Sequence, residues 1–291
     1  MVAIQIHSVA AFWDQARTDQ ELPHQNTIGE IMNRLGYKLR RVQKIKPLKK
    51  VHKKDAIFEN VRQENQAADD SPEVVRISMD AKAKVDVGDF SRDGETRASE
   101  APSALDHDTQ AKKKLVPQGI LNVTTGLLTI VIGTSHETSD FIVDCLEQWW
   151  EANKTQHPNA RRLVINLDNG PENSSARTQF LYRLVKFSDD TGLEVKLVYY
   201  PPYHSKYNLI ERCWGILENH GNGTLLNSID TVVEWAGTMT WKGAHPIVRL
   251  LEKTYDTGVR IAKAAFKAIE SRLQRDKDLP KYDVLIQPQP I

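Results

Sequence analysis

The chain has 291 residues, of which 40% are hydrophobic and 26% charged, and its formal net charge at pH 7 is only +1. This length and composition are ordinary for a globular protein rather than a disordered chain, and they suit one large domain plus a smaller one. The two cysteines, Cys145 and Cys213, do not have the spacing of a disulfide framework or a zinc motif, and no apolar run is long enough for a signal peptide or a membrane span. We therefore expect a cytoplasmic protein without a membrane partner.

The N-terminal region combines a short helix with a basic stretch. Apolar residues recur at helical spacing between Thr27 and Tyr37, and Gly36 marks a stop, so this segment could be the second helix of a helix-turn-helix. Ten cations and no acidic residue follow: Arg34, Lys38, Arg40, Arg41, Lys44, Lys46, Lys49, Lys50, Lys53 and Lys54. Such a patch suits a phosphate backbone, and a solvated lysine-rich linker is an equal alternative.

We expect residues 1–62 to be a helical, basic DNA-binding region that starts abruptly, as a truncated helix-turn-helix would. The candidate DNA-binding residues in it are Arg40, Arg41, Lys44, Lys46, Lys49 and Lys50. A polar stretch that ends in Ser-Pro then marks a linker or the end of a helix, and we expect a linker and a domain boundary at residues 63–72.

A strand is expected next, because Val75, Ile77 and Met79 alternate with polar residues up to Asp80. After a loop at residues 91–114, two apolar runs surround a Thr-Thr-Gly turn at residues 124–126 and predict a hairpin.

The middle of the chain alternates helices and strands. Helices are predicted where apolar residues recur every three or four positions, and strands where short apolar runs end in turn residues. The predicted elements are a helix from Ser139, the strand "RRLVINLD", a helix ending at Gly192, the strand "EVKLVYY" and a helix containing Glu211. Three strands followed by helix, strand, helix, strand and helix indicate an α/β fold, a mixed sheet flanked by helices. We expect this core over residues 73–225 and a mainly helical C-terminal extension over residues 226–291.

Three carboxylates fall at the ends of these elements. Asp80 ends the first strand, Asp168 ends the fourth, and Glu211 lies in the first turn of the helix after the fifth. In this topology the first and fourth strands are central neighbours, so their ends can bring the two aspartates together, and Glu211 can reach the same place. Each residue also has a structural explanation, because Asp often caps turns and Glu complements a helix dipole.

Three carboxylates in one place raise one another's pKa unless a cation neutralises them, and oxygen-only ligation selects Mg²⁺ or Mn²⁺. Two such ions about 3.5–4 Å apart can serve both sides of an in-line displacement at phosphorus. The sequence thus predicts a divalent-metal site at Asp80, Asp168 and Glu211 that cleaves or joins phosphodiesters. Lys206 could contact DNA phosphates near it or simply be a solvated loop residue, and Asn208 is equally plausible as a helix cap.

The motifs around these carboxylates resemble those of the DDE transposases of bacterial insertion sequences, and most closely the ISAzo-type family. The matching stretches are "SMDAKAKV", "GDFSRDGETR", "LDNGPENSSARTQF", "YYPPYHSKYNLIERCWGILENHGNGTLL" and "AGTMTWKGAHPIVRL". The resemblance implies a ribonuclease H-like core, with Asp80, Asp168 and Glu211 as the metal-binding catalytic triad. Leu209 departs from the family, because relatives usually have Pro before the Ile-Glu pair.

The resemblance also implies cleavage of double-stranded DNA at the terminal inverted repeats of a mobile element and joining of the 3′-ends to target DNA. We expect Mg²⁺ or Mn²⁺ as cofactor, with two ions, a homodimer on DNA, and a bacterial cytoplasmic protein that associates with the nucleoid when bound to DNA. Two alternatives stay open: a transposase-derived DNA-binding protein without activity, and a nuclease of the same fold.

Overall fold

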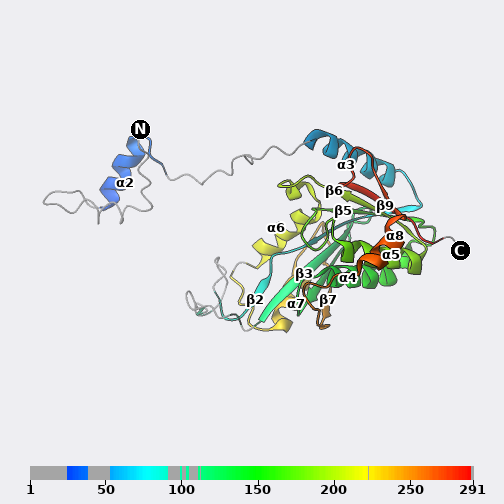
Figure 1. Ribbon diagram of the computed structural model, residues 1–291. Helices are drawn as coiled ribbons and strands as arrows, with labels where there is room; N and C mark the ends of the chain where they lie inside the picture. Colours follow the sequence, from blue (N-terminus) through cyan, green and yellow to red (C-terminus); the bar gives the residue numbers. More distant parts are fainter. Residues whose placement is uncertain are drawn as a thin grey trace. The chain divides into compact units, whose positions relative to one another are not determined.

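The computed structural model describes residues 25–38, 53–90, 99, 103–104, 111, 113–221 and 223–289. The chain divides into two units, Met1–Lys49 and Lys50–Ile291 (Figure 1). In the first unit, α2 spans Gln25–Arg34, and Gly36 follows with a φ of 89°, a value that favours glycine. The predicted N-terminal helix and its glycine stop are confirmed. The candidate DNA-binding residues of the basic stretch lie outside the described residues, namely Arg40, Arg41, Lys44, Lys46, Lys49 and Lys50.

The second unit contains the predicted mixed sheet. Its strands are β1 (Val74–Ala81), β2 (Val85–Val87), β3 (Lys113–Asn122), β4 (Leu128–Gly133), β5 (Arg162–Leu167), β6 (Glu194–Tyr199), β7 (Ile247–Leu251), β8 (Leu273–Arg275) and β9 (Asp283–Ile286). Its helices are α3 (Lys54–Asp69), α4 (Ser139–Asn153), η1 (Lys154–Gln156), α5 (Thr178–Thr191), η2 (Ser205–Tyr207), α6 (Ile210–His220), α7 (Ile229–Thr238) and α8 (Lys263–Glu270). The series β1, β3, β4, α4, β5, α5, β6 and α6 confirms the predicted order, to which the short β2 is an addition.

The strand order across the sheet is β7-β4-β3-β1-β5-β6-β9-β8, with β2 paired to β3. At the centre, β1 pairs antiparallel with β3 and parallel with β5, and β5 continues parallel to β6. The predicted neighbourhood of the first and fourth strands is confirmed by the β1–β5 pair. Their carboxyl ends therefore meet at one edge of the sheet.

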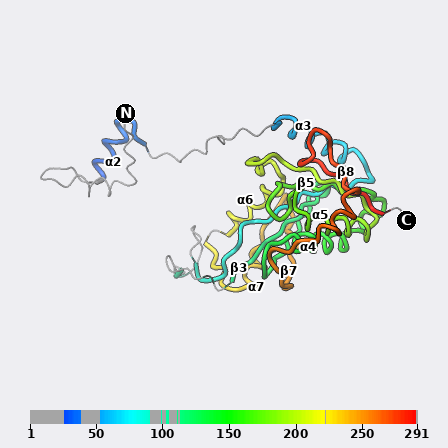
Figure 2. The backbone as a smooth tube through the Cα atoms, viewed as in Figure 1, coloured from blue at the N-terminus to red at the C-terminus, as the bar shows by residue number. Residues whose placement is uncertain are grey.

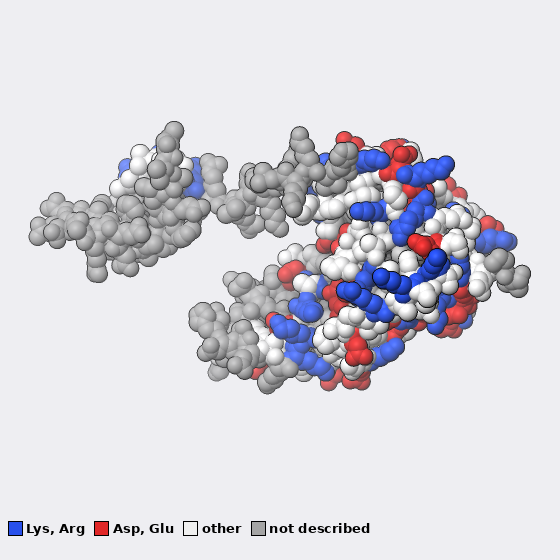
Figure 3. All heavy atoms as spheres, viewed as in Figure 1, with Lys and Arg blue, Asp and Glu red and all other residues white. Residues whose placement is uncertain are grey.

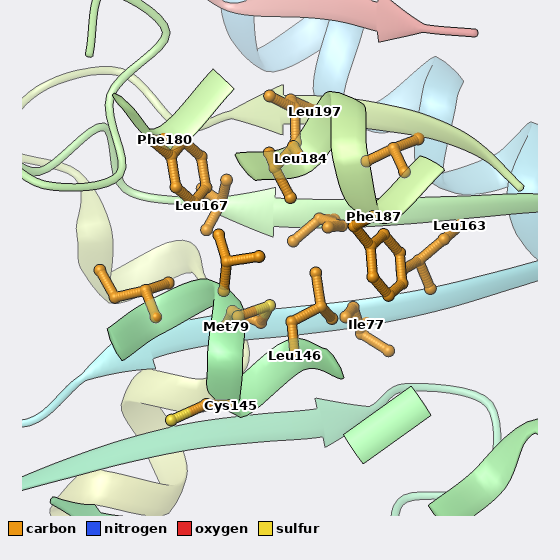
Figure 4. Packing of buried hydrophobic residues seen from close by; sticks show 14 of the residues in the cluster. Ile77, Met79, Cys145, Leu146, Leu163, Leu167, Phe180, Leu184, Phe187 and Leu197 are labelled. Atoms are coloured by element: carbon orange, nitrogen blue, oxygen red, sulfur yellow. The ribbon is translucent and has the colours of Figure 1, made fainter. Parts of the chain in front are cut away.

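One face of the sheet is covered by α4 and α5, which lie side by side (Figure 2). Side chains from both helices pack on alternate residues of β1, β5 and β6, including Ile77, Leu163 and Leu197 (Figure 4). Cys145 of α4 is buried in this cluster as a free thiol. Burial of this apolar surface is the main stabilising term of the fold.

The opposite face carries two smaller apolar clusters with a polar strip between them. In one cluster α6 and α7 pack on β3 and β4, and in the other α3 packs on β5 and β6. Between them, β1 presents Arg76, Ser78 and Asp80, all buried. Arg76 is satisfied by a two-pronged pair with Asp69 of α3, at 2.6 and 2.7 Å. Each buried polar side chain of this strip needs such a partner.

The polar stretch expected as a linker at residues 63–72 follows the other alternative in the structure, because residues 63–69 are the C-terminal part of α3 and the helix ends at Asp69. The stretch is polar because most of it faces solvent, whereas Ala68 and Val61 pack against Val164 and Val198 of the sheet. From its sequence, a helix with so few apolar residues cannot be distinguished from a linker until the surface that it covers is known.

The prediction of a mainly helical C-terminal extension is wrong. The segment contains α7 and α8, but β7 adds to one edge of the sheet by pairing with β4, and β9 adds to the other by pairing with β6. After α7, the only other α-helix in the described part of this segment is α8, which ends at Glu270, and Leu273 then pairs with Ile286 in a strand. Short edge strands have too few residues to show their period. No helix in the described ranges is long and apolar enough to cross a membrane.

This arrangement predicts that the C-terminal segment cannot be removed. A fragment of residues 50–225 loses β7 and β9, so both β4 and β6 become unpaired edges and buried apolar residues become exposed. We expect it to be insoluble or to lack a cooperative thermal transition. A fragment of residues 50–291 should instead unfold cooperatively by circular dichroism. Cooperative unfolding of the 50–225 fragment would contradict the structure.

Candidate active site

The first candidate residue, Asp80, lies near the end of β1 and is 9% exposed. β1 and β5 run in parallel with Ser78 opposite Asn166, so two residues further along each strand stand Asp80 and Asp168. Asp168 is the first residue after β5. The two aspartates predicted to meet are thus brought together by the register of the central strands.

Glu211 reaches the site from the first turn of α6. The segment before that helix is fixed to β1 by Asn208, which is fully buried. The Oγ of Ser78 donates to Asn208 Oδ1 at 2.5 Å, and Asn208 Nδ2 donates to the carbonyl of Met79 at 3.1 Å. The backbone N–H of Ile210 in turn donates to Ser78 Oγ at 3.0 Å. Asn208 therefore attaches the start of α6 to the strand that carries Asp80. The sequence left open whether Asn208 caps the helix or contacts DNA, and it did not indicate this attachment.

A second attachment joins α6 to Asp80 itself. The indole Nε1 of Trp214 donates to Asp80 Oδ2 at 3.0 Å, although the helical phase of this residue predicts only a core role. The ring fits because Gly119 stands opposite Asp80 on β3: a Cβ there would lie 2.6 Å from the Trp214 ring. The roles of Gly119 and Trp214 could not be predicted from the sequence, since they depend on which strand and which helix come into contact.

Asp168 is held in a tight loop after β5. Its Oδ1 accepts from the backbone N–H of Gly170 and from Asn173 Nδ2, each at 3.1 Å. Asn169 between them has a φ of 67°, a conformation that Asn tolerates better than most residues, and its Oδ1 accepts from the N–H of Ser175. The "DNG" turn is thus real, and it orients the Asp168 carboxylate.

The three carboxylates influence one another electrostatically. Burial raises the pKa of Asp80 to about 8, and the negative charges of Asp168 and Glu211 contribute to that rise, against the opposing hydrogen bond from Trp214. A buried carboxylate with two like charges nearby is a position where a bound cation lowers the free energy of the site. The observation shows that side chains from three separate elements share one electrostatic environment.

The donor set fits a hard divalent cation in chemistry, because every candidate ligand is a carboxylate oxygen. Beside Asp168, the Oδ1 of Asn173 is buried and has no hydrogen-bond partner among the described residues, so an oxygen acceptor there is unsatisfied. In side-chain position the fit is incomplete: within the described residues, no group of three or more His, Cys, Asp or Glu stands close enough to hold a metal ion. The charges of Asp168 and Glu211 can raise the pKa of Asp80 across a longer distance than metal ligation requires. The raised pKa is therefore compatible with carboxylates that are too far apart to share a metal ion.

A fourth carboxylate, which the sequence did not suggest, lies near the same place. Burial raises the pKa of Glu137, Lys84 lowers it, and the charges of Asp168 and Glu172 raise it. Glu172 is itself bound to Arg177 at 3.0 Å and to Ser139. The surroundings of Asp168 are therefore more acidic than the three candidate residues alone would make them.

Lys206 lies in η2, in the loop between β6 and α6, and is exposed. Its Nζ stands 5.3 Å from the centroid of the Tyr207 ring, which itself packs edge-on against Phe58 of α3. The lysine is therefore on the connection that leads to Glu211, with its charge facing solvent. Its contact with DNA stays a prediction.

The order and directions of β4, β3, β1, β5 and β6 are those of the ribonuclease H-like fold. The protein-family model described as Rhodopirellula transposase DDE domain matches residues 7–288. The chain belongs to this family of DDE transposases, whose members use divalent metal ions. The resemblance expected from the motifs is confirmed.

Solved structures with similar folds are distant from this chain. The chain is similar to that in "Mos1 transposase paired-end complex with left transposon end", with 12% identity, a TM-score of 0.49, and coverage of 78% of this chain and 68% of that one. It is also similar to that in "Structure of the HTLV-2 integrase catalytic core domain in complex with magnesium (dimeric form)", with 13% identity, a TM-score of 0.33, and coverage of 60% and 92%. No curated protein matches the chain by sequence.

The buried charge of Asp80 predicts a pH-dependent stability. Its pKa is raised in the folded state, so the folded protein binds more protons than the unfolded chain between about pH 4 and pH 8, and its stability falls as pH rises through that window. Asp80→Asn removes the charge and keeps an oxygen for Trp214. In EDTA, we expect the difference in unfolding free energy between this variant and wild type to shift in favour of the variant from pH 5 to pH 8.5, by up to about 4 kcal/mol, since about three pH units lie between pH 5 and the raised pKa.

Urea unfolding at the two pH values measures this difference. Asp190→Asn, at an exposed position of α5, is the control and should show no such change. An equal stability difference between wild type and Asp80→Asn at both pH values would contradict the buried, charge-repelled state of this carboxylate.

Leu209 stands where relatives of the chain usually have proline, and its backbone conformation predicts that a change to proline is tolerated. Leu209 has a φ of −61°, the value that proline imposes, and Asn208 before it is extended, with φ −67° and ψ 126°. Across the described part of the chain, its N–H donates no hydrogen bond. Leu209→Pro should therefore leave stability unchanged or raise it by up to about 1 kcal/mol.

Ile210→Pro is the matched control one residue further on, because it removes the N–H that donates to Ser78 and should destabilise strongly. Thermal unfolding of both variants tests the comparison. A Leu209→Pro variant as unstable as Ile210→Pro would show that the helix start differs from the one described.

Proposed function

We propose that this protein is a DNA transposase that cleaves strands at the terminal inverted repeats of a mobile element and joins the 3′-ends to target DNA. The proposal assigns Asp80, Asp168 and Glu211 as its catalytic, metal-binding residues. What supports it is the parallel register of β1 and β5, at whose ends Asp80 and Asp168 stand, and the attachment to β1 of the helix that carries Glu211, in a chain of the DDE transposase family. The raised pKa of Asp80, caused by burial and by the charges of Asp168 and Glu211, agrees with this.

In this proposal three elements carry the oxygen ligands, each with contacts that orient its carboxylate or its backbone, and the side chains move closer together when the metal ions bind. Trp214 and Gly119 fix Asp80, the hydrogen bonds from Gly170 and Asn173 fix Asp168, and Asn208 fixes the helix start that presents Glu211. Such preorganisation is most of what the protein contributes to phosphoryl transfer. When bound, two Mg²⁺ or Mn²⁺ ions would supply activation of a water or 3′-hydroxyl and stabilisation of the leaving oxygen.

The DNA partner is inferred from the family and from the charges near the site. Lys206 faces solvent on the connection to Glu211, and the basic stretch of residues 34–54 provides cations for a phosphate backbone. Binding of element ends and of target DNA is part of the proposal. The homodimer on DNA stays a prediction.

One observation favours the alternative of a DNA-binding protein without activity: the described carboxylates are not gathered closely enough to hold a metal ion as they stand. If this arrangement persists on DNA, the protein would bind element ends without cutting them. A nuclease of the same fold would cut but leave no joined product.

Cleavage and joining of a labelled duplex that carries the terminal repeat separates these functions. With Mg²⁺ or Mn²⁺, wild type should nick the repeat end and form joined product, whereas EDTA should abolish both. Asp168→Asn and Glu211→Gln should each lower the rate by at least about 100-fold, because each removes one charge from metal ligation and transition-state stabilisation.

Glu218→Gln is the matched control for Glu211→Gln, since it makes the same change at an exposed residue of the same helix and should keep nearly full activity. Wild type that binds the duplex but is as inert as the two variants would establish the inactive DNA-binding protein. Cleavage without joined product would establish the nuclease.

A further inference from the structure

A group of cations on and beside α8 has no role in the site described so far. Arg260, Lys263 and Lys267 are exposed, and within the described part of the chain none of them forms a salt bridge. Some exposed cations of the second unit have carboxylate partners, as in the pairs Arg62–Glu59, Lys154–Glu151 and Arg161–Glu73, whereas others, such as Lys186 and Lys277, also form no salt bridge within the described residues. What distinguishes Arg260, Lys263 and Lys267 is that they line one hollow together. On the face seen in Figure 3, Lys and Arg side chains gather over this part of the molecule.

The three cations surround a hollow of about 360 Å³. Phe266 contributes to its wall from the packed side of α8, and Glu270 is the only acidic residue in its lining, as far as the described residues show. The local charge is therefore positive, and a ligand of this surface must be an anion or a polyanion.

A purely structural explanation of Lys263 is weak. Lys263 is in the first turn of α8, which has no acidic residue there, and Ala262 before it offers no side-chain cap. A cation at this end of a helix opposes the helix dipole, so its position costs stability rather than adding to it. Lys267 follows one turn later on the same side, in the last turn of α8, where a cation suits the helix dipole, so only the like-charge repulsion with Lys263 opposes its position.

The cationic surface is connected to the loop that carries Asp168. Thr178, the first residue of α5, contributes to the hollow, and the loop that starts at Asp168 ends one residue before it. The side chain of Arg177 donates to the carbonyl of Val259 at 3.4 Å, so that loop is attached to the chain immediately before Arg260. The loop that begins at Asp168 therefore ends at this cationic surface.

We propose that Arg260, Lys263 and Lys267 form a binding surface for the phosphate backbone of duplex DNA, which extends the contact beyond the proposed active site. The inference rests on the proposed function for the identity of the polyanion. It is independent of the basic stretch near the N-terminus and of Lys206. Point-charge and guanidinium contacts of this kind fix the position of a duplex without reading its sequence.

The salt dependence of binding tests this surface directly. Fluorescence anisotropy of a duplex of about 30 base pairs is measured with the full chain at roughly 50 to 300 mM NaCl, a range in which counterion release is resolved. We compare wild type with the triple variant Arg260→Ala, Lys263→Ala, Lys267→Ala. Each lost phosphate contact reduces the slope of log K against log salt by about 0.9, so the triple variant should lose roughly 2–3 units of slope.

The matched control is Arg62→Ala, Lys154→Ala, Arg161→Ala, which removes the same formal charge from cations that already have carboxylate partners. Its slope should equal that of wild type. Lys263→Arg with Lys267→Arg should also keep the wild-type slope, and unchanged thermal transitions show that all variants fold.

An unchanged slope in the first triple variant would overturn the proposal, and so would an equal loss in both triple variants, which would indicate bulk charge alone. Wild type that binds no duplex would overturn this inference and the proposed function together. Wild type that binds with the expected slope difference but does not cleave would leave the surface established while the catalytic proposal fails.

Discussion

The hydrogen bond from Trp214 to Asp80 joins the helix after β6 to the central strand of the sheet, at a candidate catalytic residue. Asp80 is buried near two other carboxylates, a state whose electrostatic cost would favour a rearranged strand end. The indole donor satisfies one oxygen, and the missing side chain of Gly119 leaves the space for the ring that carries it. The packing of the Trp214 ring against Gly119 thus keeps the unfavourably buried carboxyl group of Asp80 in place.

The same helix is attached to β1 a second time, through Asn208 and Ser78, and these two contacts fix both the position and the rotation of α6. Both side chains are completely buried, so losing either partner would leave an unsatisfied polar group inside the protein. Polar pairs of this kind specify one arrangement more strongly than apolar contacts do, because only one register satisfies them. Glu211, three residues after Asn208, is presented by this geometry.

The C-terminal segment completes the sheet that supports these contacts. β7 and β9 cover its two sides, and Asp144 of α4 accepts hydrogen bonds from both Lys253 and Tyr255 at 2.6 Å, which holds the chain after β7 against the helical layer. The acidic site and the cations near α8 then stand on connected segments. A negatively charged substrate would be repelled by the acidic centre and attracted by the cations, and a bound cation at the centre would remove that repulsion.

The sequence by itself determined the order of β1 to α6, the meeting of the ends of β1 and β5, and the three candidate carboxylates, because apolar periodicity and turn residues are local properties of the chain. Only the tertiary structure decided that Trp214 serves Asp80, that Asn208 binds β1, that residues 63–69 are helical, and that the last segment supplies edge strands. These outcomes depend on contacts between residues far apart in sequence, such as Ser78 and Asn208, and on which surface a short segment covers. The apolar periodicity of a single segment does not contain the packing that determines these contacts.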